Sequence, residues 1–252
     1  VKNGTVIGGT SYYNIEVTKN SNANLTLEGV TATAGNTGSS MIDNWGTLTI
    51  TSGTYSGGLN VVKSEEGSTL TINGGTFSRD TAPRYDITGV ILVYGDTTII
   101  GGEFHNNANT TGSRTIVTGV VEGYTSITKV TGGNFTSKGG AIFHGLGKAT
   151  SDNFEVSGGT YNKSVSDSFF KDGYFAKKVG SVYTADGPYA AKIGSTGYNT
   201  LAAAVEAVAN KGTITLLQDI SSDRINLETK SFTVDLNGHT LTSTADYGVM
   251  FC

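Results

Sequence analysis

Asp43 and Glu65 are the residues of this 252-residue chain whose type and spacing best suit acid–base chemistry. Each lies 12 residues before an aromatic residue of a repeated motif, Tyr55 for the first and Phe77 for the second. If the repeat stacks one turn of chain on the next, both carboxyl groups occupy one column on neighbouring turns. One could then act as a general acid and the other as a base, as in glycoside cleavage. The alternative is a pair of solvated carboxylates at a corner, without a catalytic role.

A second group of residues is basic and aromatic. The two longest insertions, 78–86 and 105–114, follow consecutive aromatic residues of the motif, so both loops are expected to emerge on one side. We expect a patch there that binds an acidic glycan or a neighbouring subunit, made of Arg79, Arg84, Tyr85, His105 and Arg114. The alternative is that these are tolerated surface insertions. Trp45, beside Gly46, is a further candidate sugar or subunit contact, unless it packs on a neighbouring turn.

Composition excludes several functional classes. The net charge is -4 and 15% of residues are charged, which argues against nucleic-acid binding. No apolar run approaches the roughly 18 residues of a membrane span. The Gly-Gly pairs precede aromatic residues rather than a Lys and a helix, so they are not phosphate loops. Cys252 is the single cysteine, and no Cys/His cluster has zinc spacing, so we expect neither a metal nor a cofactor.

The motif consists of alternating β-formers, a Gly-rich corner and an aromatic residue. Its clear copies end at Tyr55, Phe77, Phe104, Phe135 and Tyr161, and its weaker copies at Ser11 and Ala32. Successive ends are 21 to 31 residues apart, with a base period near 22. A fixed period with loop insertions indicates a solenoid.

Each turn of this solenoid is expected to be built from strands. Thr, Val and Ile alternate with period two, and Gly pairs interrupt every apolar run. One turn should hold strands at 41–44, 47–50 and 54–56, with Gly46 and Gly53 at its corners. Stacking then aligns inward side chains in ladders. One ladder holds the five aromatic residues, and another holds Ile50, Ile72 and either Ile99 or Ile100.

This pattern resembles, over most of the chain, the right-handed parallel β-helix of the pectate-lyase-like fold. The resemblance implies an all-β solenoid with right-handed turns. No Arg or Lys matches the lyase pattern of that family, and its metal-binding aspartate cluster is not recognisable.

The repeat divides the chain into four segments. Residues 1–165 are expected to form β-helix rungs, and 166–188 a capping hairpin that turns at Asp172-Gly173 and covers the last rung near Tyr161. A linker and a capping helix should occupy 189–212, with Asn199 as the N-cap and an apolar stripe of Leu201, Val205 and Val208. Residues 213–252 would then start a following or permuted β-helix.

The two ends of the chain read as one interrupted rung. Leu241 lies 11 residues before the C-terminus and Ser11 lies 10 residues after Val1, which together make about one base period. We hypothesise that 189–252 followed by 1–188 form one capped module of about nine rungs. Either copies join head to tail, covalently or not, or one chain closes as a circular permutant. The expected junction residues are Val1, Lys2, Asn3, Gly4, Leu241, Phe251 and Cys252.

A narrower resemblance covers Ala191-Lys-Ile-Gly, Thr200-Leu-Ala-Ala-Ala-Val-Glu-Ala, Ile214-Thr-Leu-Leu-Gln-Asp219 and Val234-Asp-Leu-Asn-Gly-His-Thr-Leu241. These segments are similar to the opening of β-helical modules in large repetitive surface proteins of Gram-positive anaerobes. The resemblance implies an extracellular or cell-surface stalk, adhesin or fibre. We therefore expect a non-catalytic structural protein whose partners are its own copies and glycans or a cell surface. The alternatives are a polysaccharide lyase or glycosidase using Asp43 and Glu65, and a glycan-binding adhesin.

Overall fold

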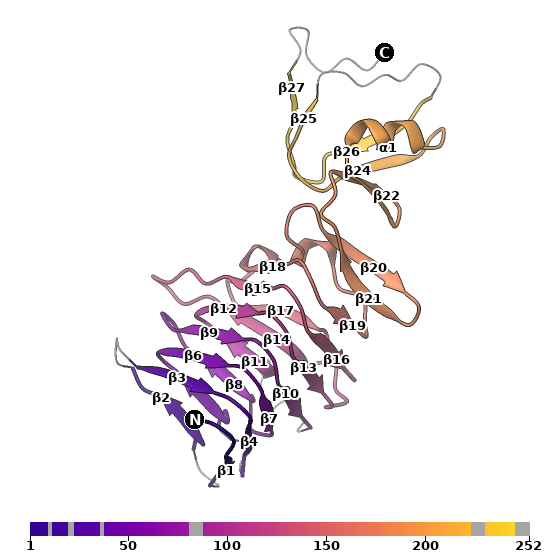
Figure 1. The fold of residues 1–252 in the computed structure, drawn as a ribbon. Helices are drawn as coiled ribbons and strands as arrows, with labels where there is room; N and C mark the ends of the chain where they lie inside the picture. The colour runs from indigo at the N-terminus through magenta and orange to yellow at the C-terminus, as the bar shows by residue number, and fades with distance from the viewer. Residues whose placement is uncertain (10–11, 20–22, 36–37, 81–87, 223–229, 245–252) are drawn as a thin grey trace.

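The computed structural model of the chain describes residues 1–9, 12–19, 23–35, 38–80, 88–222 and 230–244. Its first part is a parallel β-solenoid of about six turns, as expected from the repeat (Figure 1). In each turn the chain passes through three parallel sheets, which we call sheets 1, 2 and 3. The expectation of about nine rungs was for the joined module of 189–252 followed by 1–188. The described solenoid has about six turns.

Sheet 1 carries the residues at which the motif ends. Its parallel strands are β1 (Thr5–Ile7), β4 (Val30–Thr33), β7 (Gly53–Ser56), β10 (Thr76–Arg79), β13 (Glu103–Asn106), β16 (Asn134–Ser137) and β19 (Thr160–Tyr161). Sheet 2 holds β2 (Ile15–Val17), β5 (Ile42–Asn44), β8 (Val62–Ser64), β11 (Gly89–Val93), β14 (Arg114–Gly119) and β17 (Phe143–Leu146). Sheet 3 holds β3 (Asn24–Leu27), β6 (Thr47–Ile50), β9 (Thr69–Ile72), β12 (Asp96–Ile99), β15 (Thr128–Val130) and β18 (Phe154–Val156).

The expected aromatic ladder forms the core behind sheet 1. The rings of Tyr55, Phe77, Phe104 and Phe135 stack face to face with centroids 5.0, 5.0 and 4.8 Å apart, and Tyr161 follows at 5.5 Å. All five side chains are fully buried. Gly53 has a φ of +127°, which a residue with a side chain rarely adopts, so the corner before this strand favours glycine.

The aliphatic ladder lies behind sheet 3, and the register decides the open choice between Ile99 and Ile100. Ile50 is opposite Ile72, and Ile72 is opposite Ile99. Ile100 instead points outward and is 51% exposed. The ladder continues to Val130 in the next turn because β12 pairs in register with β15.

The first expected copy of the motif is wrong in register. Val6, not Ser11, lies opposite Ala32, because β1 pairs with β4 through Thr5–Ile7. Ser11 itself lies outside the described residues. The count that joined Ser11 to Leu241 across the chain ends therefore has no support in this structure.

An antiparallel hairpin caps the last turn. Strand β21 (Val182–Asp186) pairs with β19, Tyr161 opposite Tyr183, and β20 (Phe175–Val179) pairs with β21. The turn of this hairpin is Gly180-Ser181, whereas Asp172-Gly173 precedes β20, so the expected turn position is wrong. Gly180 has a φ of +61°, which suits this tight connection. Two 3-10 helices, Ser151–Asn153 and Asp167–Phe169, flank the capped end.

A second, separate core follows the cap. Helix α1 (Leu201–Ala207) buries Leu201 and Val205 of the expected stripe in one cluster with Ile214. Val208, which caps the end of the helix, is buried in the same cluster. The N-cap of α1 is Thr200 rather than Asn199, because the Thr200 hydroxyl accepts a hydrogen bond from the Ala203 N–H.

Strands of the second core form a short parallel stack. Strand β24 (Thr213–Leu216) pairs in parallel with β26 (Thr233–Asp235), and β25 (Ile220–Ser222) with β27 (Leu241–Ser243). The edge of β24 is covered by strand β22 (Ala191–Ile193), which forms a hairpin with β23 (Thr196–Tyr198). The expected capping helix packs its apolar residues in one cluster with Ile214 and Leu216 of β24, while β22 pairs with the strand edge.

Lys163 closes a backbone corner near the capped end. Its Nζ donates to the carbonyl oxygens of Lys138, Gly139 and Gly140 at 2.9, 2.9 and 3.2 Å. Because each hydrogen bond involves a charged donor, Lys163→Met should lower the free energy of unfolding by about 1–3 kcal/mol. Urea unfolding followed by circular dichroism measures this change. Lys148→Met, an exposed lysine, is the control, and an equal effect of both substitutions would contradict the role of the carbonyl contacts.

Among the described residues, no helix has the length and apolar character required to cross a bilayer.

Candidate functional site

A group of ionisable and aromatic residues lies on the outer face of sheet 2. Ile42 and Val62 point into the core, so alternation turns Asp43 and Lys63 outward. The register sets Asp43 directly opposite Lys63, not Glu65. The expected Asp43–Glu65 column is therefore wrong. The reason is the corner after each strand, which has two residues at 45–46 and four at 65–68.

Asp43, Lys63 and Glu65 nevertheless form one cluster. Asp43 is 1% exposed and Glu65 is 4% exposed, so they are not the solvated corner carboxylates of the alternative interpretation. Lys63 Nζ makes an ion pair with Glu65 Oε1. The Trp45 indole N–H donates to Asp43 Oδ2 at 2.8 Å, while Asp43 Oδ1 is buried and receives no hydrogen bond from the described residues.

Burial shifts the ionisation of this cluster. It raises the pKa of Glu65; the ion pair with Lys63 opposes this rise, and the nearby Asp43 carboxyl adds to it. For Lys63, burial alone would lower the pKa, but Glu65 and Asp43 outweigh it and the pKa is raised. Burial, followed by the charge of Asp43, raises the pKa of Tyr13. Burial thus favours the protonated form of Glu65 more than in a solvated glutamate.

Two hollows flank the cluster. One, of about 140 Å³, is lined by Tyr13, Ser40, Asn60, Lys63 and Leu92 among others. The other, of about 330 Å³, is lined by Lys19, Trp45, Glu66 and Tyr124 with adjoining backbone. Trp45 is half-buried, and Lys19 Nζ lies 4.6 Å from the centre of its ring. The indole therefore has a charged neighbour as well as a hydrogen bond to Asp43, and both hold it in place.

The burial of Asp43 and Glu65 limits the access of an external glycan to both carboxyl groups. A catalytic carboxyl must reach its substrate. Asp43 and Glu65 are almost fully buried, and the Glu65 carboxylate already forms an ion pair with Lys63. No protein-family model, curated protein or solved structure matches the chain.

The expected basic patch is not assembled as one exposed surface. Arg79 is fully buried in β10, where its Nε donates to the Leu59 carbonyl at 2.7 Å. His105 lies within β13, and its Nδ1 is 2.9 Å from Thr136 Oγ1. Arg114 opens β14 and donates to the Ser113 carbonyl. The insertion loops thus start later than expected, because strands extend through residues 79 and 106; Arg84 and Tyr85 lie outside the described residues.

The junction residues at the start of the chain lie along its own next turn. The Val1 ammonium donates to the Thr26 carbonyl at 2.8 Å, and Lys2 pairs with Glu28 at 2.7 Å. The Asn3 N–H donates a hydrogen bond to the Glu28 carbonyl, and the Gly4 carbonyl accepts one from the Thr31 N–H. Leu241 lies in β27, at the opposite end of the molecule from β1 in Figure 1, so the described residues do not close into a ring. Phe251 and Cys252 lie outside the described residues.

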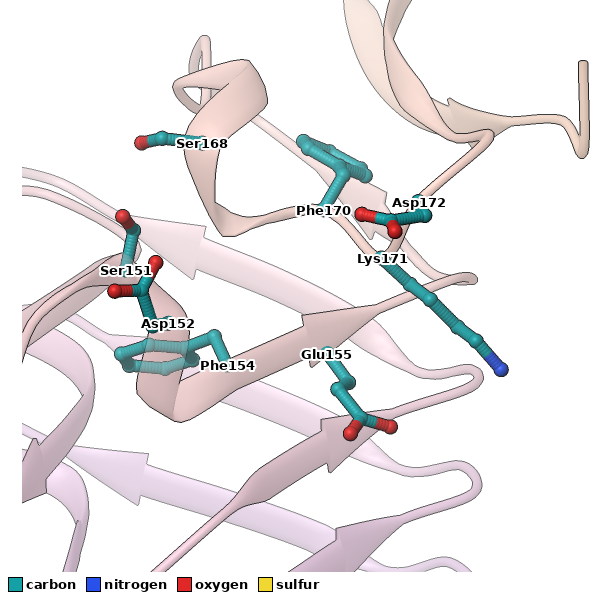
Figure 2. A pocket seen from close by; sticks show the side chains of 8 residues that line it. All are labelled: Ser151, Asp152, Phe154, Glu155, Ser168, Phe170, Lys171 and Asp172. Atoms are coloured by element: carbon teal, nitrogen blue, oxygen red, sulfur yellow. The ribbon is translucent and has the colours of Figure 1, made fainter. Parts of the chain in front are cut away.

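A further hollow, of about 360 Å³, lies at the capped end, between residues 151–155 and residues 168–172 (Figure 2). Its lining is mixed: Phe154 and Phe170 are apolar, Asp152, Glu155 and Asp172 are acidic, and Lys171 is basic. Within the described residues, no group of three or more His, Cys, Asp or Glu side chains is arranged to hold a metal ion.

Sequence reasoning missed Lys63 as a member of the cluster. A usable signal was present, because Lys63 and Glu65 are oppositely charged and only two residues apart, although Glu65 lies in the corner after β8 and not in the strand. Tyr13 and Tyr94 were also missed. Lys63 Nζ lies 5.8 Å from the centre of the Tyr94 ring, a contact between turns that no local spacing indicates.

Proposed function

We propose that the chain is a non-catalytic structural module of an extracellular or cell-surface fibre or stalk, extended by end-to-end stacking of β-helices. Copies of itself, head to tail, are the proposed partners. The observation that carries the proposal is the contrast between the two ends of the described solenoid: one is capped, and the other presents strand edges and core side chains.

The open end has partly exposed core positions. Ile15 and Leu25 are only partly buried, whereas Ile42 and Leu48, their partners in the next turn, are fully buried. Strands β2 and β3 each have a strand neighbour on one side only within the described residues. Such an edge is a template for another strand and is normally covered or paired. A further rung would bury these side chains and pair these edges.

The other end of the molecule also has strands with one free side. In the second core, β26 and β27 each have a strand neighbour on one side only among the described residues, and both run parallel to the strands before them. A contact between this end and the β2–β3 end of a neighbour joins two different surfaces. Contacts of this heterologous kind repeat without closing, and so they build filaments.

The test is a charge placed on the buried side of the edge. Leu25→Lys should abolish association, because stacking would bury an unpaired ammonium, whereas Thr26→Lys adds the same charge to an exposed position of the same strand and should leave it unchanged. Sedimentation velocity at rising protein concentration measures the assemblies. Wild-type protein that stays a single chain at every concentration, or equal association of both variants, would contradict the proposal.

A further inference from the structure

We propose that Lys63 and Asp43 become joined by an intramolecular amide bond after the chain folds, with Glu65 carrying the protons. The bond would link two neighbouring turns of sheet 2 covalently. It is a modification of the protein itself and is independent of the proposed assembly.

The register brings the reacting groups together. Asp43 and Lys63 are directly opposite on the adjacent parallel strands β5 and β8, and both side chains leave the same face of the sheet. Glu65 holds the Lys63 Nζ, and its carboxyl interacts with that of Asp43 as well. Glu65 therefore lies between the two reacting groups, and the proposed reaction requires the Lys63 side chain to rotate from the Glu65 carboxyl to that of Asp43.

The two oxygens of Asp43 have different environments. Oδ2 accepts the Trp45 N–H at 2.8 Å, which polarises the carboxyl and can stabilise negative charge on that oxygen during attack. Oδ1 is buried without a donor among the described residues, so it is the oxygen able to accept protons and leave. Trp45 thus directs the reaction to one end of the carboxyl group.

The step balances without an outside reagent. Lys63 Nζ loses two protons and forms a bond to Asp43 Cγ, and the bond between Cγ and Oδ1 breaks. Glu65 takes each proton from nitrogen and passes it to Oδ1, which leaves as water. Glu65 ends in its starting state, and one lysine charge and one aspartate charge disappear.

The surroundings favour amide over the separate ions. Holding two reactants in place replaces an encounter in solution, with effective molarities on the order of 10⁵–10⁸ M for well-oriented groups. Asp43 and Glu65 are almost fully buried, so the released water has little access back to the bond. The ammonium form of Lys63 is favoured at rest, which makes the reaction slow, but each molecule needs to react only once.

Mass spectrometry of the purified full chain tests the proposal. We expect the intact mass to fall short of the sequence mass by one water. Trypsin normally cleaves after Lys19, Lys63 and Arg79, so the bonded protein should yield one peptide covering 20–79 that carries the mass loss, in place of 20–63 and 64–79. Folded wild-type protein with the full sequence mass and both separate peptides would overturn the proposal.

Three variants separate the roles. Glu65→Gln should give the full mass, whereas Glu66→Gln, its neighbour, should still lose water; equal cross-linking in both would exclude Glu65 as the proton carrier. Asp43→Ala should also give the full mass. Loss of water in Asp43→Ala would overturn the assignment to Asp43 and place the bond on Glu65. Circular dichroism shows that each variant is folded, and the fraction of cross-linked peptide is compared only among folded variants.

Discussion

Phe104→Ala is expected to lower the free energy of unfolding by about 4 kcal/mol, the largest loss that we predict for a single substitution in this protein. Phe104 is the central ring of the aromatic ladder and stacks on both faces, with Phe77 at 5.0 Å and Phe135 at 4.8 Å. Removing the ring leaves a cavity between two other rings, and neither can move to fill it because each is held by its own strand register.

Chemical denaturation of folded protein measures this loss. Ile100→Ala removes an apolar side chain four residues away that is 51% exposed, so its effect should stay within about 0.5 kcal/mol. Tyr55→Ala should have a smaller effect than Phe104→Ala, because Tyr55 has a stacked ring on one side and Ala32 on the other. A Phe104→Ala loss near that of Ile100→Ala would show that the ladder does not carry the stability of the solenoid.

Arg79→Met is expected to raise the free energy of unfolding by about 2 kcal/mol, which is an effect of opposite sign. The Arg79 guanidinium is fully buried, and its two terminal nitrogens have no hydrogen-bond partner within the described residues. Burial lowers its pKa to about 10, so the group is still charged at neutral pH, and no carboxylate among the described residues pairs with it. Methionine has a similar length, fills the space and removes the charge; the hydrogen bond to Leu59 is the part that is lost.

Arg114→Met is the matched control, because Arg114 is also an arginine of the solenoid but is only half-buried. Its guanidinium donates to the Thr111 and Ser113 carbonyls, so its loss should lower stability by about 1 kcal/mol. Thermal and urea unfolding at neutral pH measure the change in the free energy of unfolding of each variant, which should rise for Arg79→Met and fall for Arg114→Met. A loss of stability in Arg79→Met would show that the buried charge has a compensating partner.

The parts of the fold that repeat could be predicted from the sequence. Strands at 42–44, 47–50 and 53–56 match the expected ranges within a residue or two, because Gly46 and Gly53 mark the corners directly. The stacking of Tyr55 through Tyr161 also follows from the repeat, since a constant strand register aligns equivalent positions. The choice between Ile99 and Ile100 as the ladder residue could not be made from the sequence, because both are apolar and only the strand register distinguishes them.

The candidate site could not be predicted in the same way, because it depends on corner lengths. Counting back from the aromatic ladder crosses the corner between sheets 2 and 3, which is two residues longer after β8 than after β5. The count therefore found Glu65 where Lys63 lies. Arg79 shows a related limit, since a charged residue beside an insertion suggests a surface loop, yet the strand extends through it and turns its side chain inward.

The capping hairpin has a consequence for force. In the solenoid, backbone hydrogen bonds run along the stacking axis in all three sheets, so an axial pull is shared among three sets of bonds. At the cap, sheet 1 continues through the pairing of β19 with β21, and sheet 3 continues only through an isolated bridge between Val156 and Phe170. Beyond the cap, a few links such as the Gly173–Leu217 backbone bond and the Lys192–Asp167 ion pair join the second core. If the module works in a fibre under tension, it should extend at this narrow connection before any solenoid turn separates.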